Sequence, residues 1–111
     1  METKIQKTLS QWFPDAFANA KKSELKSDYD VLRNFANYTK KLINDHCENR
    51  SEPFKIINLL YSKGTLFEKN IIENEFLNVI ATEEKSMTLK EHLVLMPEPL
   101  RSIYLRTILE N

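Results

Sequence analysis

The chain has 111 residues, with 16 basic and 16 acidic side chains, one cysteine and one glycine. This length fits one domain with a single modest core, and 41% hydrophobic with 29% charged residues is typical of a globular protein. One glycine disfavours sandwiches, barrels and glycine-rich phosphate sites, and a formal net charge of zero disfavours a general binder of nucleic acid or anionic membranes. We therefore expect one all-α domain over residues 1–111.

Apolar side chains at helical spacing predict the first helix: Ile5, Leu9, Trp12 and Phe13. This helix starts near Thr3 and ends before Pro14, because proline disfavours helical geometry in the residue that precedes it. A lone tryptophan in a small domain usually lies in the core, so we expect Trp12 there; the alternative is a docking side chain on an exposed helix. A weaker helix is expected over residues 15–26.

Capping residues predict the next three helices. Ser27 caps a helix that continues to about residue 48. A helix with Pro53 in its first turn ends at Gly64, which we expect to be a left-handed C-cap. Thr65 and Glu68 form a capping box that opens a helix over about 66–82. This last helix is apolar around most of its circumference, which is typical of a helix packed on several sides.

Two shorter helices follow. A second capping box, Thr88-Leu89-Lys90-Glu91, opens a helix that Pro97 ends, and Pro99 starts the last one. The sequence therefore predicts an irregular bundle of five to six helices around a central buried helix at about 66–82.

Three stretches resemble a known family: Leu60-Tyr61-Ser62-Lys63-Gly64, residues 70–76 (NIIENEF), and Leu95-Met96-Pro97 followed by Leu100-Arg101 and Tyr104. They are similar to a small all-helical domain-of-unknown-function family of Bacteroidota-type bacteria, which reads roughly LYxxG, NAIENxF and LLPxxLRxxY. The likeness covers about residues 59–108, with Ile71 and Met96 as mild departures. Members often occur near polymorphic toxin genes, so the resemblance implies an immunity protein.

Catalytic and metal-binding constellations are not favoured by the sequence. Cys47 and His46 are neighbours, and adjacent residues on a helix point about 100° apart, so they do not form a reactive pair. Two histidines 46 residues apart and one cysteine lack the spacing of a metal site. We predict that the protein is not an enzyme, with no catalytic residues, no metal and no cofactor.

Carboxylates on the central helix suggest a protein interface. We predict that Glu68, Glu75, Glu83 and Glu84 form an acidic surface that binds a basic protein partner, such as the active site of a toxin nuclease. A solvated helix face without a partner is the plainer interpretation.

Polar residues near the same helix have expected structural roles. Asn70, Asn74 and Asn78 recur at every fourth position, and we expect them to hydrogen-bond at a partly buried seam. Arg101 is expected to pair with Glu73.

Two further interpretations belong to other functional classes. The first is a homo-oligomeric structural or regulatory domain, built on the Trp12 helix or the C-terminal helix. The second is a helix-turn-helix over 55–74, which its acidic recognition helix disfavours because phosphate would repel it. The lone cysteine, a polar stretch after Met1–Lys7 in place of a signal peptide, and apolar runs too short to span a bilayer predict a cytoplasmic protein with no nucleic-acid or membrane partner.

Overall fold

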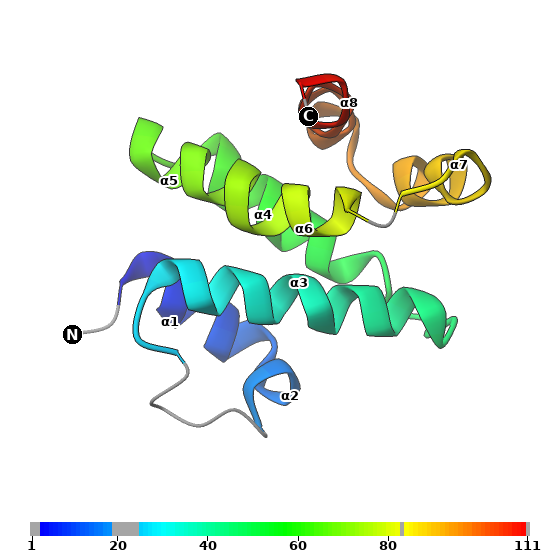
Figure 1. Cartoon of the computed structure of the whole chain (residues 1–111). Coiled ribbons are helices and arrows are strands. Elements are labelled where there is room, and N and C mark those ends of the chain that lie inside the picture. The colour runs from blue at the N-terminus through cyan, green and yellow to red at the C-terminus, as the bar shows by residue number, and fades with distance from the viewer. Residues whose placement is uncertain (1–2, 19–24, 83, 111) are drawn as a thin grey trace.

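Helices account for most of the residues that the computed structural model describes, which are residues 3–18, 25–82 and 84–110 (Figure 1). The elements are α1 (Lys4–Trp12), α2 (Pro14–Phe17), α3 (Asp28–Asn44), α4 (Glu52–Ser62), α5 (Leu66–Ile72), a π-helical turn (Glu73–Leu77), α6 (Asn78–Ala81), α7 (Ser86–Leu95) and α8 (Glu98–Glu110). None of the described residues is in a strand. The all-α prediction is confirmed.

The core lies between α3 and the continuous helical segment made of α5, the π-helical turn and α6. Figure 1 shows α3 running alongside this segment, with α1 and α2 on its other side. Phe76 of the π-helical turn is fully buried, and its ring centroid lies 5.8 Å from that of Phe35 and 6.1 Å from that of Phe54. Aromatic contacts at these separations add to the energy of apolar burial. The predicted central helix is therefore present, with a π-helical turn inside it.

Two predicted N-terminal caps are confirmed. The Ser27 hydroxyl accepts a hydrogen bond from the backbone N–H of Asp30 (3.4 Å). Thr65 and Glu68 form the expected reciprocal box, in which each side chain accepts from the other residue's backbone N–H at 3.1 and 2.9 Å. Both caps satisfy N–H groups that have no partner within the helix.

The left-handed cap predicted at Gly64 is wrong, because Gly64 does not have a positive φ. Glycine is suited to this position by a close approach: a Cβ atom here would lie 2.8 Å from the carbonyl oxygen of Leu60. Among the described residues, the positive φ belongs to His46 (54°), just after α3. The helix predicted to reach residue 48 therefore ends at Asn44, and His46 is exposed.

The second predicted capping box is also wrong. Helix α7 begins at Ser86, two residues before the expected cap, and Thr88 lies inside its first turn. The Thr88 hydroxyl accepts from the backbone N–H of Lys85 (3.1 Å) and donates to the carboxylate of Glu84. The weak helix predicted over 15–26 is seen as the single turn of α2, and residues 19–24 lie outside the described part of the chain.

Candidate functional site

Trp12 lies at the surface with 65% of its area exposed, so the expectation that it belongs to the core is wrong. Helix α1 ends at Trp12, and the backbone of Phe13 leaves the helical region (φ −134°, ψ 62°). The Phe13 ring is buried, with its centroid 5.0 Å from that of Phe35. Because Phe13 takes the position against α3, its neighbour Trp12 is left outside the core.

A groove of about 300 Å³ adjoins Trp12. Its lining comes from α1, α2, α3, α4 and the residues that connect them: Trp12, Phe13, Pro14, Asp15, Tyr38, Asn49, Glu52 and Ile56. This volume is at the lower limit of ligand pockets, which span about 300–1,000 Å³. The groove therefore has room for a few side-chain groups of a larger partner.

The charges that line the groove are negative. Asp15 lies in the first turn of α2, and Glu52 lies in the first turn of α4, where the helix dipole favours a carboxylate. Glu52 also forms an exposed ion pair with Lys55 of the same helix (3.2 Å). Burial, then Coulombic interaction with Asp15 and Cys47, raises the pKa of Tyr38 above its ordinary value.

Of the four glutamates predicted to form one acidic surface, the structure describes Glu68, Glu75 and Glu84. The Glu68 carboxylate accepts a hydrogen bond from the backbone N–H of Thr65 at the cap of α5, and the Glu75 carboxylate lies 3.5 Å from Nε of Arg33. The side chain of Glu84 is only 7% exposed. Glu83 lies outside the described residues. Each of the three that the structure describes therefore has an internal structural contact.

Glu84 belongs to a buried polar cluster between α6, α7 and α8. Its Oε1 accepts a hydrogen bond from the Tyr104 hydroxyl (3.1 Å), and its Oε2 lies 2.9 Å from Nδ1 of His92 and also accepts from Thr88. Tyr104 is fully buried, and burial together with the Glu84 charge raises its pKa. The cluster satisfies a buried carboxylate and ties α7 to the rest of the fold.

The other polar predictions are partly corrected. Asn70 and Asn74 are exposed rather than held in a seam, and Asn78 is half-buried. Arg106, five residues beyond the predicted Arg101, pairs with Glu73 (2.9 Å), and the Tyr61 hydroxyl donates to the same carboxylate. Arg101 instead donates from Nε to the carbonyl of Met96 (2.9 Å).

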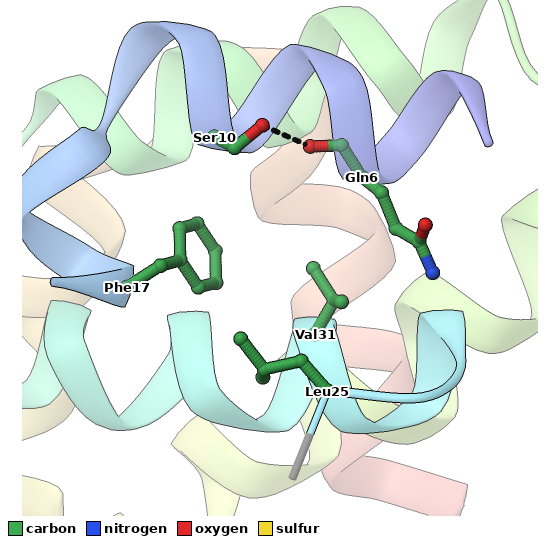
Figure 2. A pocket seen from close by; sticks show the side chains of 5 residues that line it. All are labelled: Gln6, Ser10, Phe17, Leu25 and Val31. Atoms are coloured by element: carbon green, nitrogen blue, oxygen red, sulfur yellow. Dashed lines mark hydrogen bonds between the residues drawn. The ribbon is translucent and has the colours of Figure 1, made fainter. Parts of the chain in front are cut away.

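Two other hollows are less informative about function. Figure 2 shows Phe17, Leu25 and Val31 around an apolar hollow of about 140 Å³, with Gln6 and Ser10 of α1 on its other side. None of the described residues that line it is charged.

The second hollow, of about 280 Å³, lies between α7 and α8 and includes Lys90 and Arg101. It carries the opposite charge to the Trp12 groove.

The described residues also include the side chains considered for catalysis and metal binding. Within residues 3–18, 25–82 and 84–110, no three His, Cys, Asp or Glu side chains are placed to hold a metal ion. Cys47 is a free, half-buried thiol, and the exposed His46 has a left-handed backbone. Across the same described residues, every helix is too short or too polar to cross a membrane.

The sequence does not predict the Trp12 groove, because Trp12 and Phe13 are adjacent. Both Trp12 and Phe13 fit the apolar face of α1, and periodicity does not say which of them is left outside where a helix ends. The available signal is Pro14, which disfavours helical geometry at Phe13, so that the helix ends between the two aromatic residues.

A family model matches residues 7–110, which is most of the chain, and its description is a domain of unknown function, DUF7674. No curated protein and no solved structure gives a significant match.

Proposed function

We propose that this chain, which belongs to the DUF7674 family of domains of unknown function, is a protein-binding module. The observation that carries this proposal is the exposure of Trp12 beside a groove. Tryptophan is enriched among the residues that dominate binding energy at interfaces, and its exposure in an unbound protein leaves a large apolar surface in water. Phe13, packed against Phe35, fixes the position from which Trp12 projects.

The specific role we propose is that of a cytoplasmic immunity protein, which neutralises a cognate bacterial toxin by covering its active site. The resemblance of the three motifs to a family found near toxin genes supports this role. The Trp12 groove supports the binding step, because it offers an apolar anchor with charged residues beside it. No enzymatic step is required of the chain for such a function.

An affinity capture from the lysate of the native host tests the proposal, with bound proteins identified by mass spectrometry. We expect one stoichiometric partner that carries a toxin-like domain, and we expect Trp12→Ala to lose it. Leu109→Ala is the matched control, because Leu109 is 85% exposed on α8 and away from the groove lining. Recovery of the tagged protein alone, or equal capture by both variants, would contradict the proposal.

A growth assay separates immunity from mere binding. The captured partner is expressed in a bacterial host with the wild-type chain or with Trp12→Ala. Rescue of growth by the wild type alone is expected for an immunity protein. A partner that does not impair growth would leave a protein-binding module and contradict the toxin role.

Reversing Glu68, Glu75, Glu83 and Glu84 together is a poor test of this interface. Glu68 closes a helix cap and Glu84 fills a buried cluster, so the variant would lose stability whatever surface binds the partner.

Self-association is a second candidate, and one observation favours it. The groove between α7 and α8 includes two cations, Lys90 and Arg101, whereas the Trp12 groove is lined by two carboxylates. These surfaces have complementary charge and lie on different helices, which is the arrangement of a head-to-tail contact between copies. Light scattering at high protein concentration tests it, and a monomer there would contradict it.

A further inference from the structure

The charges around Trp12 indicate what kind of partner binds there, if the proposed binding function holds. We propose that the Trp12 groove binds a cationic segment of another protein and takes up a lysine or arginine side chain between the Trp12 indole and the carboxylates of Asp15 and Glu52.

The sign of the charge in the groove favours a cationic partner. Asp15 and Glu52 both line the groove, and none of the described residues that line it is Lys, Arg or His. Opposite charge on the partner would steer association, and like charge would be repelled. The chain as a whole has no net charge, so this local excess is not a consequence of overall composition.

The indole of Trp12 also favours a cationic side chain. The face of an indole attracts a cation within about 6 Å of the ring, and tryptophan is the best of the aromatic side chains for this contact. Elsewhere in the fold, Nζ of Lys69 lies 5.6 Å from the ring centroid of Tyr61. In the groove, Trp12 is 65% exposed, so its ring is accessible to a partner.

The groove can also exchange its own ion pair for a new one. Glu52 is paired with Lys55, whose side chain is 59% exposed, and such surface pairs contribute little free energy. An incoming lysine or arginine can share or replace this contact. The Tyr38 phenol and the Asn49 side chain, which also line the groove, offer oxygen acceptors for the remaining N–H donors.

The test uses the intact chain and its own fluorophore. Trp12 is the single tryptophan, so the intrinsic emission reports directly on the groove. The probe is a decapeptide of lysine, serine and glycine, and the control peptide has glutamate in place of lysine. We expect the lysine peptide alone to protect Trp12 from acrylamide quenching, and we expect its affinity to fall with added salt.

Two variants that replace carboxylates by amides of the same size make the test specific. Asp15→Asn with Glu52→Gln should weaken binding of the lysine peptide about tenfold. Glu110→Gln is the matched control, because it removes one exposed carboxylate at the end of α8, away from the groove lining, and should leave binding unchanged. Equal affinity of the double variant and the wild type, or equal binding of the glutamate peptide, would overturn the inference.

The outcome can be distinguished from failure of the proposed function. If Trp12→Ala loses the captured protein while the Asp15→Asn/Glu52→Gln variant keeps it at all salt concentrations, the binding function stands and the cationic partner is wrong. If the lysine peptide binds as expected but no protein is captured, the groove is a cation-binding site and the proposed function is wrong. If the wild type self-associates and the double variant does not, the groove binds a second copy, and the inference of a separate partner is overturned.

Discussion

Helices α3 and α7 are held in the same fold by different forces. Seven residues of α3 are buried, among them Phe35, Ala36 and Thr39, which are fully inaccessible. None of the ten residues of α7 is buried, and its Met87 and Val94 are largely exposed. Apolar burial therefore fixes α3, whereas α7 depends on half-buried leucines and on the polar cluster of Glu84, His92, Thr88 and Tyr104.

This difference indicates where the molecule will open first. Local opening is cheapest where few apolar contacts are lost, and α7 fits that description. A change in the core should lower the stability of the whole domain, whereas a change in the polar cluster should release α7 in particular. Single substitutions in the core, in the polar cluster and at Trp12 test this division.

Removal of the ring of Phe76 should have the largest effect. Phe76 is fully buried and lies between Phe35 and Phe54, so Phe76→Ala should lower the free energy of unfolding by about 3–5 kcal/mol. Urea denaturation followed by circular dichroism measures this change. Phe67→Ala is the control, because Phe67 is 58% exposed and should cost no more than about 0.5 kcal/mol.

If Phe76→Ala does not fold, Phe76→Leu keeps the test open. The smaller loss of volume should cost about 1 kcal/mol. A Phe76 variant no less stable than Phe67→Ala would contradict the account of the core.

Removal of the Glu84 carboxylate should have the next largest effect. Glu84→Ala leaves the buried Tyr104 hydroxyl without its acceptor and removes the contacts of the carboxylate with Thr88 and His92, so it should cost about 1–3 kcal/mol. Hydrogen exchange is the decisive measurement, because amides of α7 should gain more exchange than amides of α3. Glu110→Ala serves as the control. Equal gains in both helices would show that α7 does not depend on this cluster.

Tyr104 should give the cluster a signature at alkaline pH. In the unfolded chain Tyr104 ionises near pH 10, whereas in the folded chain burial beside Glu84 raises its pKa and keeps it protonated. The folded state then binds more protons, so its stability falls as the pH rises above 10, by up to about 1.4 kcal/mol per pH unit for this group.

Tyr104→Phe removes that contribution and one hydrogen bond. The variant should be about 1 kcal/mol less stable at pH 7, with a shallower loss of stability between pH 10 and 12. Urea denaturation of both proteins at each pH measures the two slopes. Parallel slopes would contradict the protonated, buried Tyr104.

The two regions also differ in how far the sequence predicts them. The caps at Ser27 and Thr65 depend on residues three positions away, and helical periodicity places Phe35 and Phe76 inside, so local pattern suffices for the core. The cluster at Glu84 depends on His92 and Tyr104, which are eight and twenty residues further along the chain. The sequence therefore predicts an exposed carboxylate at Glu84, because only the packing of α7 and α8 brings its partners close to it.

Thr88 illustrates the same limit at one residue. The pattern Thr-x-x-Glu predicts a cap, but Thr88 can also donate its hydroxyl to Glu84, and that contact places it inside the first turn of α7. The candidate site shows the limit again, since Trp12 and Phe13 have equal apolar character. Pro14 ends the helix here, and the packing of Phe13 against Phe35 then leaves Trp12 exposed.

Trp12→Ala should have the smallest effect on stability and the largest on binding. With 65% of its area exposed, Trp12 contributes little buried surface, so its removal should change the free energy of unfolding by about 0.5 kcal/mol or less. Urea denaturation measures this beside the affinity capture. A loss comparable to that of Phe76→Ala would show that Trp12 belongs to the core in solution, and the binding groove would then be wrong. An unchanged stability with lost capture would separate the two roles of one aromatic pair, in which Phe13 holds the fold and Trp12 binds the partner.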